Sequence, residues 1–126
     1  MPTRVLLSVK PRFAEAILAG TKKFEFRRSL FRNPDIDTVV LYASSPVQRV
    51  IGEFRIGDIL ALTPPELWAR THRWSGIDRS YFDEYFHERE VGFALKVERP
   101  RAYRRSLSLQ NHFGISYPPQ SFCYLS

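Results

Sequence analysis

Hydrophobic and polar residues alternate along several short stretches of the chain, and a period of two is typical of β-strands. A highly charged stretch is GTKKFEFRR at residues 20–28, in which Phe24 and Phe26 share one parity. The other parity holds Lys23, Glu25 and Arg27. Because successive side chains of a strand point to opposite faces, this segment is expected to turn its aromatic face to a core. A solvated charged face on the other side is the ordinary interpretation.

The same patterning predicts five further strands. They are expected over residues 4–10, 38–43, 50–62, 91–98 and 122–125. Residues 38–43 (TVVLYA) are apolar on both faces, which is typical of a central strand. Gly52 and Gly57 interrupt the segment 50–62 and indicate bulges or bends.

Helices are predicted between these strands. They are expected from Pro11 to a stop at Gly20, from Thr63 to about Trp74, in a short segment capped by Ser80 with Asp83, and over residues 106–112. Pro11 suits a first helical turn and Gly20 suits the residue after the last turn. TPPE at residues 63–66 has the spacing of a capping box. The aromatic residues of YFDEYF, 81–86, lie at helical spacing and are interpreted as core packing.

About six strands, a helix after the first and helices between the fourth and fifth predict an α+β fold around a curled sheet or small β-barrel. The 126 residues, 44% of them hydrophobic, suit one domain over residues 1–126. No apolar run approaches the ~20 residues that cross a bilayer, and the start lacks the layout of a signal peptide. We therefore expect a cytoplasmic protein without a membrane partner.

The charge balance favours a polyanionic partner. The chain has 19 Lys and Arg against 13 Asp and Glu, a formal charge of +6. Basic residues gather over residues 1–28, and a second group, Arg99, Arg101, Arg104 and Arg105, follows near residue 100. One cysteine, Cys123, and three scattered histidines have no metal-ligand spacing. No metal and no cofactor are expected.

Several blocks, in order, resemble the activating signal cointegrator homology (ASCH) domain. They are LLSVKPRFAEAILAGTKKFEFRR at 6–28, YASSP at 42–46, VIGEF at 50–54, PPELW at 64–68 and PPQSFCYL at 118–125. The core of the resemblance is Gly-x-Lys-x-x-x-x-Arg, here Gly20, Lys22 and Arg27. The resemblance implies a PUA-like β-barrel that associates with RNA and regulates transcription or translation. It also implies a cleft beside the barrel, with the Gly-x-Lys turn and the next strand as one wall.

On this basis the ligand is expected to be RNA or a modified nucleotide or nucleoside, with DNA as an alternative. The predicted binding residues are Ser8, Lys10, Lys22, Lys23, Glu25, Arg27, Arg28, Tyr42, Ser44, Gln120 and Ser121. Phosphates are expected at the basic residues of 22–28, and a base deeper in, near Tyr42 and Gln120. Structural roles stay open for three of them: a backbone-bonded hydroxyl for Ser8, an ordinary turn for Ser44, and support of the proline turn for Gln120.

Two enzymatic alternatives also follow from the resemblance, with Lys22 and Glu25 as the catalytic candidates. A metal-independent ribonuclease would use Glu25 as base, nearby cations for the phosphate, and a lysine or Tyr42 as acid. An acetylcytidine amidohydrolase would use Lys22, but Glu25 occupies the position of the family's nucleophilic Thr. The amidohydrolases of the family also use a glutamate, and the candidates for it here are Glu66 and the acidic residues of 83–90. A protein-interaction module is the remaining class.

One structural prediction concerns the charged stretch itself. Like charges crowded on a strand repel each other, and an interleaved carboxylate relieves that repulsion. Glu25 is therefore expected to hold Lys22, Lys23 or Arg27 in place, so that the charges form one network within the cleft.

Overall fold

A computed structural model describes residues 3–125; residues 1–2 and 126 of the predicted domain lie outside the described residues. The strands are β1 (Arg4–Val9), β2 (Phe24–Arg27), β3 (Thr38–Ala43), β4 (Arg49–Leu62), β5 (Gly92–Leu107) and β6 (Phe122–Leu125). The helices are α1 (Pro11–Ala19), α2 (Pro64–Thr71), α3 (Arg79–Tyr85) and α4 (Leu109–Phe113), with a 3₁₀ turn η1 (His72–Trp74) after α2. The predicted α+β fold, with a helix after the first strand and helices between the fourth and fifth, is confirmed.

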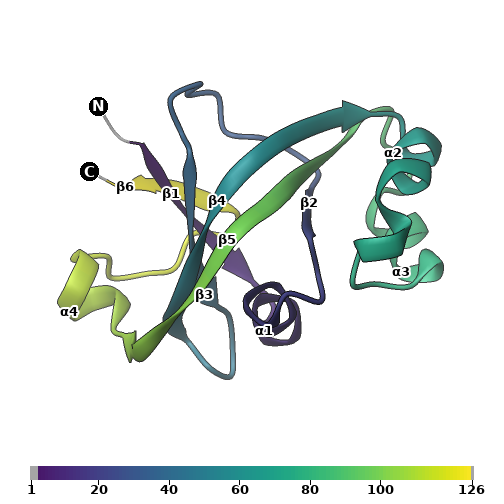
Figure 1. Cartoon of the computed structure of the whole chain (residues 1–126). Helices are drawn as coiled ribbons and strands as arrows, with labels where there is room; N and C mark the ends of the chain where they lie inside the picture. Colours follow the sequence, from purple (N-terminus) through teal and green to yellow (C-terminus); the bar gives the residue numbers. More distant parts are fainter. Residues whose placement is uncertain (1–2, 126) are drawn as a thin grey trace.

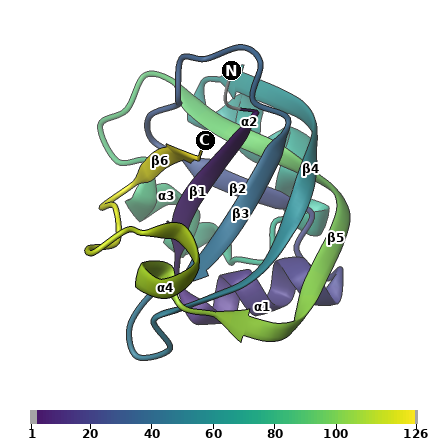
Figure 2. The same cartoon turned by 90° about the vertical axis from the view of Figure 1, so that its left-hand side faces the viewer.

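The six strands form one curled sheet in the order β2-β5-β4-β3-β1-β6 (Figures 1 and 2). β1 and β3 pair in parallel, and the other neighbours are antiparallel. β2 and β6 are the two edges, and no strand ladder joins them within residues 3–125, so the barrel is open on that side. A cavity lies at this opening, between β2 and the segment before β6.

The long strands β4 and β5 connect the main sheet to the helices. Their register shifts between Val50 and Gly52 and again between Ile56 and Asp58, which confirms the bulges predicted at Gly52 and Gly57. Bulges add twist and bend a strand. The bent hairpin carries the chain away from the sheet, so that α2 and α3 pack beyond β2 rather than on the main core (Figure 1).

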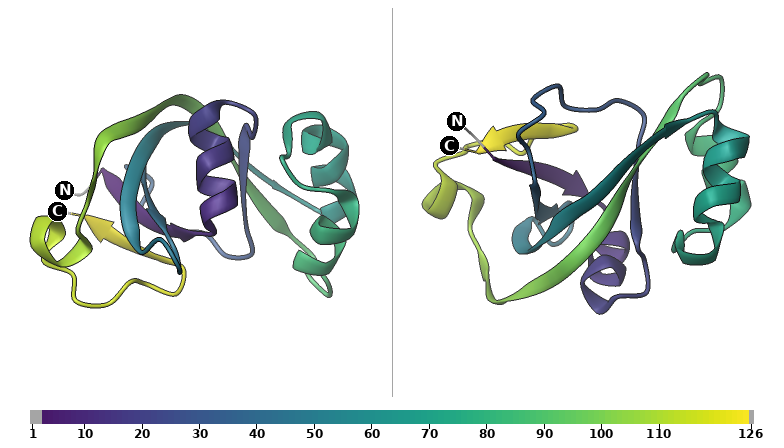
Figure 3. Two further views of the ribbon diagram at one scale, coloured as in Figure 1. Left: turned by 90° about the horizontal axis from the view of Figure 1, so that it is seen from below. Right: turned by 45° about the horizontal axis from the view of Figure 1, so that its top comes forward.

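Three apolar clusters follow from this arrangement. The main core lies between the sheet and α1, which runs below the curled strands (Figure 3), and includes Ile17, Phe54 and Leu95. A second cluster lies under α4. A third joins Phe26 of β2 to Leu67 of α2 and other apolar residues of the helical segment. The aromatic face of β2 therefore enters a core, as predicted. This core is the third cluster, called the helical cluster below because most of its residues come from α2, α3 and their surroundings.

The register of β2 on β5 determines where its charged face points. Glu25 is opposite Leu95, which belongs to the main core, whereas Phe26 is opposite Ala94, which belongs to the helical cluster. Directly paired residues project from the same face of a sheet. Glu25 and Arg27 therefore point to the inside of the open barrel. The interpretation of this side of β2 as a solvated charged face is wrong for these two residues.

Three local predictions are corrected. Thr63 makes no capping hydrogen bond with its side chain; the prolines that follow it have no N–H groups, so the helix start has fewer donors to satisfy. Asp78 caps α3 by accepting from the Tyr81 N–H at 2.9 Å, in place of the predicted Ser80. β5 continues to Leu107 instead of ending near residue 98, because pairing with β4 overrides the local break at Pro100.

Candidate functional site

A cavity of about 460 Å³ opens between β1, β2, α1, α3 and the segment before β6. This volume lies within the range of small-molecule sites. The wall combines cationic residues with aromatic rings and a few neutral polar groups. Five cations, Lys10, Lys22, Arg27, Arg28 and Arg89, line it, and among residues 3–125 its one carboxylate is that of Glu25.

Lys22 lies on the inner wall because α1 ends sharply before it. Gly20 follows the helix in the left-handed conformation, with φ 86°, and its N–H and that of Lys22 bond back to carbonyls of the last turn. The Lys22 side chain is 1% exposed. Its Nζ donates to the Ser75 carbonyl at 2.5 Å and lies 4.8 Å from the ring centre of Phe26. Gly76 leaves room for the lysine stem, since a Cβ there would lie 2.6 Å from its Cγ.

Burial lowers the pKa of Lys22 from 10.5 to about 8, although the negative charge of Glu25 opposes this effect. Desolvation disfavours the charged form of an amine. The side chain can therefore exchange a proton near neutral pH, which an ordinary lysine does poorly.

Arg27 connects the two edges of the open barrel. Its Nη1 donates to the Glu25 carboxylate at 3.1 Å. Its Nη2 donates to the Ser121 hydroxyl at 2.6 Å and to the Ser121 carbonyl at 3.1 Å. Both charged side chains are nearly buried, with 11% of Arg27 and 7% of Glu25 exposed. The predicted role of Glu25 as a partner for the cations is confirmed for Arg27, and the guanidinium spans the gap where no strand ladder forms.

Two tyrosines of α3 form the opposite wall. Tyr81 and Tyr85 are one turn apart, with ring centres 6.4 Å apart and planes 12° from parallel. The Tyr85 hydroxyl donates to the Phe26 carbonyl at 3.2 Å, and burial raises the pKa of that hydroxyl. Arg28 lies over the Tyr85 ring at 4.5 Å and Lys10 over the Tyr81 ring at 5.3 Å. Flat rings beside cations are the groups that bind nucleobases and phosphates.

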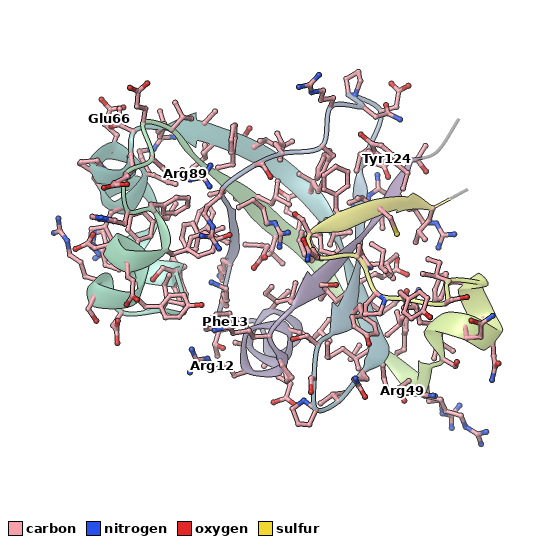
Figure 4. The ribbon with its side chains drawn as sticks, turned by 180° about the vertical axis from the view of Figure 1, so that it is seen from behind. Arg12, Phe13, Arg49, Glu66, Arg89 and Tyr124 are labelled. Atoms are coloured by element: carbon pink, nitrogen blue, oxygen red, sulfur yellow. The ribbon has the colours of Figure 1, made fainter. Side chains whose placement is uncertain are left out.

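Figure 4 shows the same site from behind. Phe13 lies on the side of α1 that faces α3, and Arg89 lies on the helical side of the molecule. Arg49 lies at the far end of the molecule, near α4, and Glu66 points outward from α2. Neither Arg49 nor Glu66 lines the cavity.

The structure brings together most of the predicted site residues. Those that line the cavity are Ser8, Lys10, Lys22, Glu25, Arg27, Arg28, Gln120 and Ser121. Ser8 also has its structural role, since its hydroxyl donates to the Pro119 carbonyl at 2.6 Å. The Arg99–Arg105 group does not line the cavity.

Three predicted residues lie elsewhere. Tyr42 is 4% exposed and packs with Leu6 and Val40 in the cluster under α4, so the expected base position beside Tyr42 and Gln120 is not formed. Ser44 follows β3 in the turn, and its N–H bonds to the Val9 carbonyl. Lys23 is exposed, and its Nζ lies 4.2 Å from the Trp74 ring centre instead of in the cavity.

The aromatic wall was not evident from the sequence. The helical spacing of residues 81–86 predicts core packing for all four aromatic residues, but Phe82 and Phe86 are buried while Tyr81 and Tyr85 line the cavity. The chemistry of the residues held the signal: tyrosines occupy the positions that face water and phenylalanines those that face the core. Arg89 stands between Glu88 and Glu90, and this acidic setting gives no sign in the sequence that Arg89 lines a basic cavity.

Two kinds of feature are absent from residues 3–125. These residues contain no cluster of three His, Cys, Asp or Glu side chains able to hold a metal ion. No helix among them has the length and apolarity needed to cross a membrane.

The sequence and the fold match a known family. The model of the ASCH domain matches residues 7–101, so the chain belongs to the ASCH domain family. The ASCH domain-containing ribonuclease of Zymomonas mobilis is 30% identical over 122 residues, which cover 95% of this chain and 82% of that protein. The crystal structure of ASCH from Zymomonas mobilis has a TM-score of 0.90 at 28% identity and covers 98% of this chain and 88% of that one. The chain spans 15% of a longer relative, ATP synthase subunit alpha of Ureaplasma parvum, to which it is 28% identical.

Proposed function

We propose that this domain binds single-stranded RNA and holds one nucleotide in the cavity. The observation that carries the proposal is the composition of the cavity wall: five cations and one internally paired carboxylate surround a space of about 460 Å³ that is also lined by Phe13, Phe26, Tyr81 and Tyr85. A nucleotide needs both kinds of wall, because its phosphate is anionic and its base is flat and aromatic. The relative named as a ribonuclease supports RNA as the class of ligand.

In this proposal Lys10, Arg28 and Arg89 bind phosphate at the mouth, since all three lie on the cavity wall and none forms an ion pair within residues 3–125. The base lies against the ring of Tyr85, which is part of the cavity wall. Ser8 and Gln120 offer neutral hydrogen-bonding groups, and a Gln side chain can both donate and accept.

A salt titration tests the proposal. Fluorescence anisotropy of labelled single-stranded RNA should show binding whose affinity falls with salt, because neutralised phosphates release counterions. Replacing Arg28 by Gln should weaken binding about five- to tenfold and reduce the salt slope by about one phosphate. The matched control is Arg104→Gln, which removes the same charge outside the cavity. If both variants lost the same amount of RNA affinity, binding would be explained by general attraction to a basic protein, and the proposed site in the cavity would be contradicted.

A second candidate, metal-independent cleavage of RNA, is favoured by the ribonuclease relative and by the pKa of Lys22. Glu25 would accept the proton of the 2′-hydroxyl, Arg27 would face the phosphate, and protonated Lys22 would give a proton to the leaving 5′-oxygen. Lys22 replaces Tyr42 as the acid, because Tyr42 is buried away from the cavity. Cleavage should persist with chelator, decline above about pH 8 as Lys22 deprotonates, and disappear in Glu25→Gln.

The acetylcytidine amidohydrolase has no observation in its favour. Glu25 stands at the position of the nucleophilic Thr and is bound to Arg27, and neither Glu66 nor the acids of residues 83–90 line the cavity. Acetate release from acetylcytidine by the purified protein would overturn this conclusion.

A further inference from the structure

A second hollow of about 300 Å³ lies beside the cavity. Lys10, Arg28, Tyr81 and Tyr85 line both spaces, and Glu84 lines only the second. The cavity and this outer hollow therefore share a wall of two cations and two aromatic rings. A ligand with two linked parts can occupy both spaces while its linking group lies against that shared wall.

The shared wall has the chemistry of a link between nucleotides. Lys10 and Arg28 are positively charged and lie over the tyrosine rings, at 5.3 Å and 4.5 Å from the ring centres. A phosphodiester that links the two spaces can bind Lys10 and Arg28, because both side chains line both spaces. A base in the outer hollow can then stack on a tyrosine or on the guanidinium plane, as bases of single strands commonly do.

Glu84 gives the outer hollow a chemical preference. Its carboxylate can only accept hydrogen bonds, whereas the cations of the hollow can only donate. The edge of guanine presents two neighbouring N–H donors, which match the two oxygens of a carboxylate. Uracil presents one such donor between two acceptors, so Glu84 repels most of its edge.

We propose that the outer hollow binds the nucleotide adjacent to the one in the cavity and that Glu84 makes it prefer guanine. The smallest complete ligand is then a dinucleotide with guanine on one side. This inference rests on the proposed function, since the cavity must already hold a nucleotide of the strand.

The first test separates the two proposals by ligand length. Isothermal titration at low salt compares UMP with the dinucleotides UpU, GpU and UpG. We expect GpU or UpG to bind about five- to a hundredfold more tightly than UMP, the gain typical of stacking one further base. Equal binding of UMP and of all three dinucleotides would overturn the outer hollow and leave the cavity site standing. No binding of any of the four would instead overturn the proposed function.

The second test uses variants of the outer hollow in the full chain. Glu84 is exposed, so Glu84→Gln should fold normally, and it should remove most of the preference for guanine over uracil while UMP binding stays unchanged. Tyr81→Leu should bring dinucleotide affinity near that of UMP. The control is Glu90→Gln, which removes the same charge from a residue that lines neither space. A guanine preference that survives in Glu84→Gln, or that is lost equally in Glu90→Gln, would contradict the proposal.

Discussion

The buried lysine predicts an unusual dependence of stability on pH. Lys22 is 1% exposed and its pKa is lowered from 10.5 to about 8 by burial. Between these two pKa values the unfolded chain keeps the proton on this lysine and the folded chain has lost it. Because the unfolded state then binds more protons, the free energy of unfolding should rise with pH across this window.

The size of the rise follows from the two pKa values. They differ by ~2.5 units, and each unit corresponds to about 1.4 kcal/mol. The wild-type domain should therefore gain about 3 kcal/mol between pH 7 and pH 11, relative to a chain without the lysine. Lys22→Met provides that chain, because methionine keeps much of the apolar stem and does not titrate.

Urea denaturation at several pH values, followed by the fluorescence of Trp68 and Trp74, measures this difference. Other groups titrate in the same range, so the quantity of interest is the wild-type free energy of unfolding minus that of Lys22→Met. Lys96→Met, at an exposed position of β5, is the control and should leave the pH dependence unchanged. If the difference in free energy of unfolding between wild type and Lys22→Met changed by less than about 1 kcal/mol from pH 7 to pH 11, the conclusion that burial lowers the pKa of Lys22 would be refuted.

Three further predictions concern the same site. Glu25→Gln should weaken RNA binding although it makes the domain more basic, because Arg27 loses its 3.1 Å partner; tighter binding with an unchanged circular dichroism spectrum would contradict an organised site. Arg27→Lys should also weaken binding, since a lysine cannot span both Glu25 and Ser121, whereas Arg55→Lys, at an exposed ion pair, should not. Gly76→Ala should lower the free energy of unfolding by about 1–3 kcal/mol in urea titrations, because its φ is +69° and the new Cβ would meet the Lys22 stem.

Local patterning predicted the elements of the fold well. The helix from Pro11 to Gly20, the strands on either side of it and the apolar strand at 38–43 are all present. Each is encoded by a short period of apolar residues together with a residue that starts or stops the element. The same patterning failed at the end of β5, where pairing with β4 outweighs local preference.

Most of the site could be predicted because the blocks that resemble the ASCH domain contain its residues. The parity of β2 by itself determined that Glu25 and Arg27 share one face and Phe26 the other. It did not determine which face meets water, since both turned out to be covered: one by the helical cluster and one by the interior of the open barrel.

Only the tertiary structure decided which distant segments meet at the cavity. Arg27 meets Ser121, Lys22 meets Ser75, and Tyr85 meets the backbone of Phe26. Such contacts join residues 53 to 94 positions apart, and a local period carries no information about what packs on each face. The lowered pKa of Lys22 has the same origin, because burial is a property of the assembled fold and the sequence around a lysine shows only that it is charged.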